Sequence, residues 1–258
     1  MQFGPGENRP PQPASGHRYN WSNIEKLGVC PEVRDLDTYL VRTLTGGQLA
    51  RSYLRDVHGT LNSSDFSFQS IKVEHDKITA LQKLQPADIT ATHDLFFKDV
   101  HPWAGTVRRP FDVATFNGLV GADSIRIETE LELTCAQIKI LIDEAWAPIY
   151  AIAVCHLRLA RIHPFQDGNG RVIREITAAQ IECVYDKPLT WSNRERYFDA
   201  LRGASAGIVS PLCNYLLEEI GEQSVPERVT SPFRLAPFLA GDARALLPFD
   251  EQLRSTIL

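Results

Sequence analysis

Apolar side chains recur at helical spacing along most of this chain, and the pattern predicts a mainly α-helical protein. The strongest stretch runs from residue 136 to residue 162. It is almost continuously apolar and is broken at Pro148, so its second half is expected to be a deeply buried helix. Asn193 can cap one later helix, and Pro211 fits the first turn of another. Together the runs predict helices at residues 86–100, 149–162, 170–185, 193–204 and 209–221.

The N-terminal part of the chain carries a weaker helical signal. Residues 31–44 predict a short helix that begins at Pro31 and is stopped by Gly46 and Gly47. Its apolar face is predicted to contain Leu36, Leu40, Val41 and Leu44. Residues 64–84 have mixed periodicity and predict one or two helical segments.

The helical pattern lapses between residues 103 and 134, a segment that contains several glycines. Within it the sequence SIRIETELEL, residues 124–133, alternates apolar with polar side chains. Strict alternation is typical of a strand with one buried face, so this stretch predicts a short exposed strand or a hairpin.

Composition narrows the class of protein. The net charge is −5 and there is no block of consecutive Lys or Arg, so neither nucleic acid nor an anionic membrane is an expected partner. No apolar run approaches the roughly 20 residues that span a bilayer, and residues 1–20 lack the apolar segment of a secretory signal, so the cytoplasm is the expected compartment. The five cysteines are widely spaced without a CxxC pair, and they are expected to be reduced core thiols.

The sequence HPFQDGNGR, residues 163–171, places a base, an acid and a glycine-containing turn at the start of a predicted helix. Gly168, Asn169 and Gly170 tolerate backbone angles that point successive N–H groups into one spot. The helix start adds its partial positive charge there. Such a turn is expected to bind phosphate oxygens.

The charged residues around this turn suit a magnesium nucleotide. Arg171 and Arg174 lie on one side of the predicted helix, so both guanidinium groups can reach a polyphosphate at its start. Asp167 would repel phosphate unless a cation lay between them, and one carboxylate with phosphate oxygens and water is a usual Mg²⁺ shell. His163, with an ordinary pKa of about 6.5, can take a proton from an incoming hydroxyl at neutral pH.

Each of these features has an ordinary explanation when it is taken alone. A histidine before proline or a GNG turn is usually a loop, and two arginines at helical spacing are usually a solvated face. Their occurrence together in one short motif favours a site. By contrast, His156 lies in an apolar helix and is expected to be a core histidine. Trp103 and Trp191 are expected to pack the fold, with Trp191 and Tyr197 beside an adenine as the alternative.

The motif HPFQDGNGR resembles the signature HPFx(D/E)GNGR of Fic-domain proteins at every fixed position, and the following VIR extends the match to a second arginine. HDLFFKDVHPWAGTVR, residues 93–108, and PLTWSNRERYFDAL, residues 188–201, are similar to two further stretches of that family. The resemblance implies an all-α Fic fold, a helical bundle with a short β-hairpin flap.

The resemblance also implies transfer of AMP from ATP to a Tyr, Thr or Ser hydroxyl of a target protein, with release of pyrophosphate. Carried onto this sequence, the family's general base is His163 and its Mg²⁺ ligand is Asp167. Arg171 holds the α and β phosphates, and Arg174 holds the γ phosphate. The anion hole is formed by the backbone N–H groups of Gly168, Asn169 and Gly170.

Two alternatives to this activity stay open. Relatives that act as protein kinases carry a lysine where this chain has Gly170, so the resemblance favours AMP transfer over phosphate transfer. Relatives with other nucleotide donors share the motif, so a different nucleotide or phosphate donor is one alternative. A catalytically silent binding module is the other, and the intact His163, Asp167, Arg171 and Arg174 argue against it.

Two more segments are candidates for target docking and inhibition. Residues 108–130 correspond to the family's flap, which pairs with a target as an added strand; an ordinary surface hairpin is the alternative. The docking edge would be formed by Ser124, Ile125, Arg126 and Ile127. SIKVEH, residues 70–75, partly matches the family's inhibitory (S/T)xxxE(G/N) helix, so Glu74 is a candidate to pair with Arg174, with an ordinary surface helix as the alternative.

The expected organisation has four parts. These are a disordered tail at residues 1–20, an N-terminal helical extension at 21–84, the Fic core at 85–221 and a C-terminal extension at 222–258. ATP is the expected substrate and Mg²⁺ the expected cofactor. The expected partners are a target protein and an antitoxin-like inhibitor protein, in the cytoplasm or, for a delivered effector, in a host cell.

Overall fold

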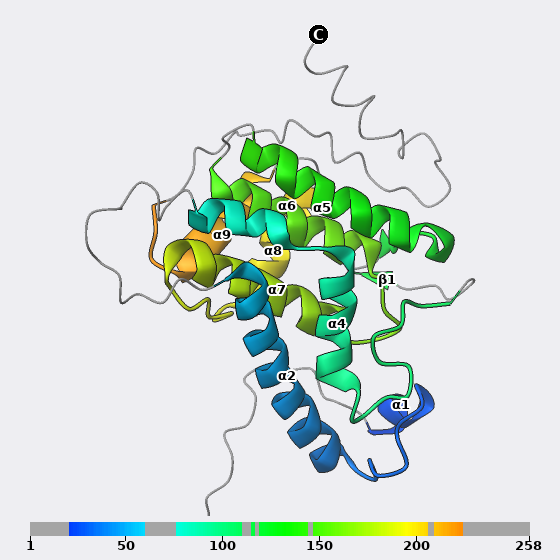
Figure 1. Ribbon diagram of the computed structural model, residues 1–258. Helices are drawn as coiled ribbons and strands as arrows, with labels where there is room; N and C mark the ends of the chain where they lie inside the picture. Colours follow the sequence, from blue (N-terminus) through cyan, green and yellow to red (C-terminus); the bar gives the residue numbers. More distant parts are fainter. Residues whose placement is uncertain are drawn as a thin grey trace, which may run out of the picture.

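The computed structural model describes residues 21–59, 76–109, 115–116, 119–143, 147–205 and 209–223, and these residues form an α-helical fold (Figure 1). The helices are α1 (Trp21–Lys26), α2 (Leu36–His58), α4 (Pro86–Phe97), α5 (Ile127–Asp143), α6 (Pro148–Ile162), α7 (Asn169–Tyr185), α8 (Arg194–Ser205) and α9 (Ser210–Glu219). Two single 3₁₀ turns are η1 (Leu81–Lys83) and η2 (Ser124–Arg126). The all-α prediction is confirmed.

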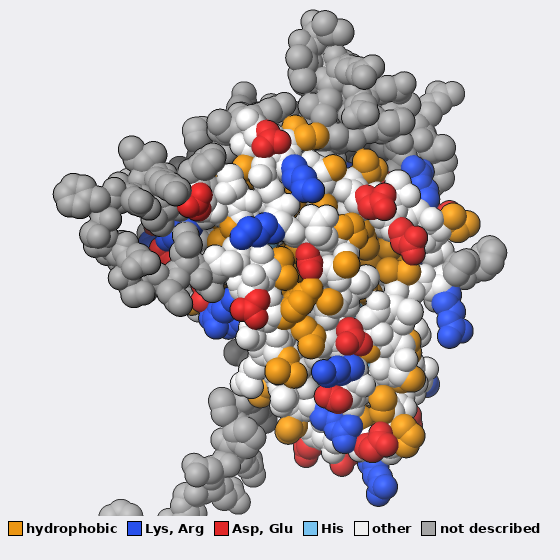
Figure 2. Space-filling view, in the orientation of Figure 1, with side chains coloured by type: hydrophobic (Ala, Val, Ile, Leu, Met, Phe, Trp, Pro, Cys, Tyr) orange, Lys and Arg blue, Asp and Glu red, His pale blue; other side chains and the backbone are white. Residues whose placement is uncertain are grey.

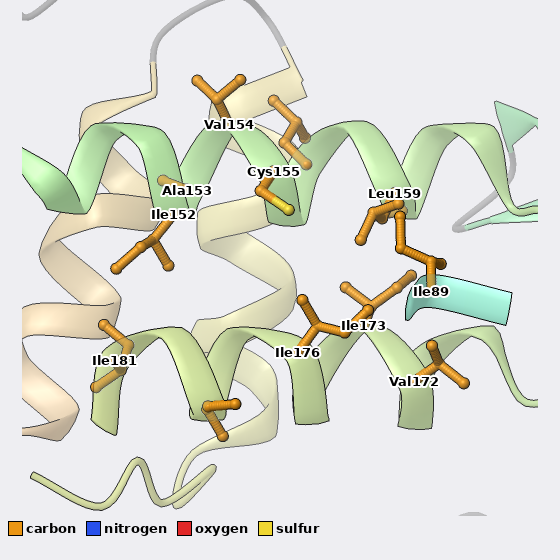
Figure 3. Close-up of a cluster of buried hydrophobic side chains, with 14 of the residues drawn as sticks. Ile89, Ile152, Ala153, Val154, Cys155, Leu159, Val172, Ile173, Ile176 and Ile181 are labelled. Carbon is orange, nitrogen blue, oxygen red and sulfur yellow. The ribbon is translucent and has the colours of Figure 1, made fainter. Parts of the chain in front are cut away.

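Helices α6 and α7 form the centre of the core. Every residue of α6 after Pro148 is buried, as its mainly apolar sequence predicts, and the buried residues include His156, Arg158 and Arg161. Cys155 and Leu159 of α6 lie opposite Ile173 and Ile176 of α7, and Ile89 of α4 lies at one end of the row (Figure 3). Burial of each large apolar side chain contributes about 1.5–3 kcal/mol, so this interface is a principal source of stability.

The later helices follow the sequence closely. The Asn193 side chain accepts a hydrogen bond from the Arg196 backbone N–H at 3.0 Å, which caps α8 as predicted. Pro211 lies in the first turn of α9. N–H groups in the first turn make no hydrogen bond within the helix, so the absence of an N–H at proline costs nothing there. The predicted helix at 86–100 is also present and ends at Phe97.

Helix α2 is longer than predicted, and it passes through both glycines that were expected to stop it. It begins after Asp35, whose side chain accepts a hydrogen bond from the Thr38 backbone N–H at 2.7 Å. A Cβ atom on Gly46 would lie 2.5 Å from two backbone oxygens of α4. Gly46 therefore allows close contact between the two helices, and that packing outweighs the roughly 1 kcal/mol that a glycine such as Gly46 or Gly47 costs in a helix.

The buried face of α2 is also different from the predicted one. Val41 is 64% exposed and Leu44 is 69% exposed. The buried residues are Tyr39, Thr43, Gly46, Ala50 and Leu54, which lie at spacings of three and four along the helix. This row faces α4 and α7, and Figure 1 shows α2 running beside α4.

The strand predicted from the alternating sequence at 124–133 is wrong. Asp123 accepts a hydrogen bond from the Ile125 backbone N–H, η2 follows, and Ile127 begins α5. Ile127 and Leu131 are buried one helical turn apart, so contact with the core favours the helix. The proposed docking edge at Ser124, Ile125, Arg126 and Ile127 is therefore not a strand.

A short antiparallel pair does occur inside the flap segment 108–130. Strand β1 (Thr115–Phe116) pairs with β2 (Leu119–Val120), with Thr115 opposite Val120. This pair lies earlier in the chain than the strand predicted at residues 124–133.

Other expectations concern surface and termini. All five cysteines are free, and all but Cys30 are buried. No described helix is long and apolar enough to cross a membrane. Acidic and basic side chains are interspersed on the face drawn in Figure 2. The predictions for residues 1–20, for Glu74 and for residues 224–258 fall outside the described residues.

Candidate active site

The loop between α6 and α7 is held in one conformation by its own residues. Gly168 has φ of +78°, and a Cβ atom there would lie 2.4 Å from two ring carbons of Phe97, so glycine is required on both counts. The Asn169 side chain accepts from the Phe165 N–H at 2.8 Å and donates to the Phe165 carbonyl at 2.7 Å. Asn169 thus closes the loop with its side chain, which leaves its backbone N–H for the predicted anion site.

His163 lies at the C-terminal cap of α6, in the left-handed backbone region with φ of +50°. Its Nδ1 lies 3.3 Å from the Ala160 carbonyl oxygen. A carbonyl can only accept, so this contact places the ring proton on Nδ1 and the basic lone pair on Nε2. Burial lowers the pKa of His163, Arg108 lowers it further, and Asp167 and the Ala160 carbonyl act in the opposite direction.

Arg108 holds the end of α6 and the start of the loop. Its Nε donates to the His163 carbonyl at 2.8 Å, and its Nη2 donates to the carbonyls of Ala122 and Ile162. Its own backbone N–H donates to the Pro164 carbonyl at 2.9 Å. A buried guanidinium thus satisfies the last carbonyls of α6 and fixes the backbone that carries His163.

The N-terminus of α7 faces the same region. The backbone N–H groups of Arg171 and Val172 bond to the Gly168 carbonyl. The N–H groups of Asn169 and Gly170 come first in the helix, where the i−4 partner of an α-helix does not exist. The partial positive charge of a 17-residue helix is centred on these groups, which makes them suitable for an anion.

Arg171 and Asp167 are one helical turn apart and in contact. Arg171 Nη2 donates to Asp167 Oδ2 at 3.1 Å and to the Tyr39 hydroxyl at 2.8 Å. The guanidinium carbon lies 4.4 Å from the centre of the Phe97 ring, a cation–π arrangement. The side chain of Asp167 is 39% exposed, so its carboxylate is open to a ligand from solution.

Asp167 fits the role of a protein ligand to Mg²⁺. An exposed carboxylate beside an anion-binding helix end supplies one hard oxygen donor. Among the described residues, no three His, Cys, Asp or Glu side chains are grouped so that they could hold a metal ion by themselves. A cation at Asp167 would therefore take its other ligands from phosphate and water, as the sequence predicts.

Arg174 lies next to a chain of buried hydrogen bonds. The Thr177 hydroxyl donates to the Ile173 carbonyl, so it accepts from His156 Nδ1 at 2.7 Å. Nε2 of His156 then accepts from the Tyr197 hydroxyl at 2.8 Å, and the Tyr197 oxygen is left to accept from Arg174. Burial lowers the pKa of His156 to about 3, so this ring is neutral.

The prediction that His156 is a core histidine is confirmed by its complete burial. The prediction for Trp191 is also met, because its ring packs 5.2 Å from Tyr197 and 6.2 Å from Tyr215. Trp103 packs against His101 at 4.3 Å between ring centres. A place beside adenine for Trp191 and Tyr197 stays a prediction.

His93 was not predicted to take part, although it lies in a stretch that the sequence singled out. Its Nδ1 accepts from the Gly105 N–H at 2.9 Å, so Nε2 carries the proton and donates to the Asp167 carbonyl at 3.2 Å. Burial lowers the pKa of His93 to about 4, which keeps the ring neutral. Its ring is stacked 3.9 Å from Phe165. His93 thus anchors the loop that carries Asp167.

The structure places all the residues of the predicted motif at one end of α7. Three contributing residues had not been assigned a role from sequence, namely Tyr39, His93 and Arg108. His93 and Arg108 lie in residues 93–108, a stretch whose similarity to the family was noted from the sequence, but without a role for either residue. Tyr39 has no local signal, because its partner Arg171 is 132 residues away.

Residues 83–181 match a family model described as the Fic/DOC family. Two curated proteins named "Protein adenylyltransferase Fic", one from Aedes aegypti and one from Culex quinquefasciatus, are 30% identical to this chain over 73 residues. The matched segment is 28% of this chain and only 15% of the length of each relative.

Among solved structures, BepC protein from Bartonella tribocorum, which has AMPPNP bound, is 18% identical to this chain. The match has a TM-score of 0.44 and covers 69% of this chain and 98% of that chain. The family model and the complete HPFQDGNGR motif agree on the same part of the sequence. The similarity of this chain to the Fic/DOC family is therefore located in residues 83–181, which contain the motif.

Proposed function

We propose that this protein is an adenylyltransferase, which transfers AMP from ATP to a Tyr, Thr or Ser hydroxyl of a target protein and releases pyrophosphate. The relatives named adenylyltransferase support the reaction class, although they match over a short segment. The observation that carries the proposal is the position of Asp167, Arg171 and the Arg174 guanidinium at the N-terminus of α7, joined by one short loop to His163 at the end of α6.

In the proposed reaction, Nε2 of His163 takes the proton of the target hydroxyl as its oxygen attacks the α phosphorus of ATP. One P–O bond forms to the target, and the bond between the α phosphorus and the oxygen that bridges to the β phosphorus breaks. The leaving group is pyrophosphate. Transfer of this kind depends mainly on positioning and charge neutralisation, which fits a site of backbone N–H groups and arginines.

Each charged group has a proposed place in this reaction. The N–H groups at Gly168, Asn169 and Gly170 bind phosphate oxygens, Arg171 holds the α and β phosphates, and Arg174 holds the γ phosphate. Mg²⁺ bound at Asp167 would neutralise phosphate charge. Arg174 is partly exposed, and its Nη1 would lie 3.2 Å from a Cβ atom on Gly170 at the start of α7, which supports a role in binding an anion there.

The proposal is tested with α-³²P-labelled ATP, GTP, UTP and CTP, each incubated with the protein, Mg²⁺ and a cell lysate. We expect transfer of label from ATP to protein, and a decrease of about 100-fold or more in His163→Ala. Circular dichroism of the variant establishes that it is folded. Label transferred equally by His163→Ala would contradict the role of His163.

The same experiment separates the alternatives. Preference for another α-labelled nucleotide would assign a different donor, and transfer from γ-labelled ATP alone would assign a kinase. Absence of transfer together with binding of Mg²⁺ and ATP would support a catalytically silent module. An inhibitor protein would be detected as a lysate component that suppresses transfer.

A further inference from the structure

Tyr39 belongs to α2, outside the segment that matches the Fic/DOC family model, yet it contacts the candidate site directly. We propose that Tyr39 is a positioning residue whose hydroxyl fixes the guanidinium group of Arg171. The N-terminal helix α2 is thereby part of the nucleotide site. The identity of the ligand rests on the proposed function; the contact between Tyr39 and Arg171 does not.

The hydroxyl of Tyr39 contacts Arg171 in a defined geometry. Tyr39 is fully buried, and its hydroxyl accepts a hydrogen bond from Arg171 Nη2 at 2.8 Å. Its ring meets His101 edge-on, with 5.6 Å between ring centres. Phe97 lies against the face of the same guanidinium. Tyr39 and Phe97 together restrict both the position and the plane of the Arg171 group.

Asp167 is the other acceptor for Arg171 Nη2, and its role is different. A cation at Asp167 would compete with Arg171 for the carboxylate oxygens. Tyr39 is neutral at physiological pH, so its hydroxyl would continue to accept from Arg171 when Asp167 turns to a cation. A neutral acceptor, unlike a carboxylate, adds no negative charge that would offset the attraction of Arg171 for phosphate.

Helix α2 is attached to the domain in a way that keeps Tyr39 in place. Gly46 allows α2 to touch α4. Arg51 forms an ion pair with Glu175 of α7, and Arg55 Nη2 lies 2.6 Å from Glu182 Oε1 further along the same helix. The helix that carries Tyr39 and the helix that carries Arg171 are thus joined at two additional points.

The test compares Tyr39→Phe with Tyr53→Phe in the full chain. Both substitutions remove one hydroxyl from α2. Tyr53→Phe is the matched control, because the Tyr53 hydroxyl donates to Asp88 Oδ1 at 2.6 Å, away from the motif loop. Calorimetry with ATP and Mg²⁺ is expected to show about tenfold weaker binding for Tyr39→Phe and unchanged binding for Tyr53→Phe. In an Arg171→Ala background, Tyr39→Phe is expected to have no additional effect.

A second measurement needs no nucleotide. Phenylglyoxal labels accessible arginines, and mass spectrometry gives the rate at Arg171 itself. We expect labelling of Arg171 to be several-fold faster in Tyr39→Phe than in wild type or Tyr53→Phe. Thermal unfolding of both variants separates this effect from loss of the fold.

Equal labelling of Arg171 in Tyr39→Phe and Tyr53→Phe would overturn the inference. A full effect of Tyr39→Phe on binding in the Arg171→Ala background would also overturn it. If wild type binds no nucleotide, the proposed function fails, while the labelling rates still decide whether Tyr39 positions Arg171.

Discussion

His163 is the residue proposed to act as the base, and its surroundings suit that role. Its ring is half-buried at the end of a helix, and the buried guanidinium of Arg108 lies nearby. Both features disfavour the charged imidazolium and lower the pKa of His163. The contact of Nδ1 with Ala160 leaves the lone pair on Nε2. These surroundings therefore favour the neutral ring, with Nε2 as its basic atom, more than those of an ordinary histidine do.

The first prediction concerns the pH dependence of transfer. The proposed base acts only when it is neutral. A lowered pKa therefore shifts the acidic limb of the pH profile of kcat/KM to lower pH. We expect that limb below the ordinary histidine value of about 6.5 when rates are measured from pH 5 to pH 8 at constant ionic strength.

Unfolding must be followed over the same pH range. His93 and His156 are buried and neutral, with lowered pKa values, so the unfolded chain binds protons that the folded chain does not. Stability is therefore expected to be full above about pH 6.5 and to decrease as the pH falls below it. A limb in kcat/KM at or above pH 6.5, in protein shown to be folded, would be inconsistent with the described surroundings of His163.

At the scale of elements, close contact between α2 and α4 depends on the two glycines in the middle of α2. A Cβ atom on Gly46 would meet backbone oxygens of α4, which cannot move independently of that helix. A Cβ atom on Gly47 would meet the ring of Phe96 at 2.7 Å, and a side chain can turn. The same substitution is thus expected to have different effects at two adjacent positions.

The second prediction compares Gly46→Ala with Gly47→Ala by urea unfolding. Alanine gains about 1 kcal/mol of helix propensity at either position. Overpacking against a backbone costs about 1–3 kcal/mol or more, so Gly46→Ala is expected to be the less stable variant by about 2 kcal/mol. Equal free energies of unfolding would show that α2 can move away from α4 without loss.

At the scale of the whole molecule, the predicted boundary between an N-terminal extension and a Fic core at residue 85 separates segments that share one core. Tyr39, Ala50 and Leu54 of α2 belong to the same buried cluster as the side chains of α6 and α7. We therefore propose that the folding unit includes α2. The match to the family model begins at residue 83, so the matched segment is shorter than the proposed folding unit.

The third prediction follows from this shared core. A chain limited to residues 83–223 loses the fully buried apolar side chains Tyr39, Ala50 and Leu54 of α2, each worth about 1.5–3 kcal/mol except for the smaller Ala50. Domains of this size are stable by only about 5–15 kcal/mol. We expect the fragment to show no cooperative thermal transition by circular dichroism, in contrast to the full chain. A transition at the temperature of the full chain would indicate that residues 83–223 fold independently.

The sequence by itself determined the helices with strong periodicity, and it placed the residue types of the proposed site together in residues 163–174. Amphipathic spacing and capping by residues such as Asn193 are local properties, so they can be recognised without knowledge of neighbours. The motif is equally local, because His163, Asp167 and the two arginines lie within residues 163–174, which form one loop and the start of one helix.

Only the tertiary structure decided which way the ambiguous segments folded and what supports the site. Gly46 continues a helix because α4 lies against it, and the alternating sequence after Ser124 is helical because Ile127 and Leu131 meet the core. Tyr39, His93 and Arg108 act on the motif through contacts that join distant parts of the chain. Local sequence carries no information on such partners, because burial and hydrogen bonding between distant residues arise only when the helices have packed.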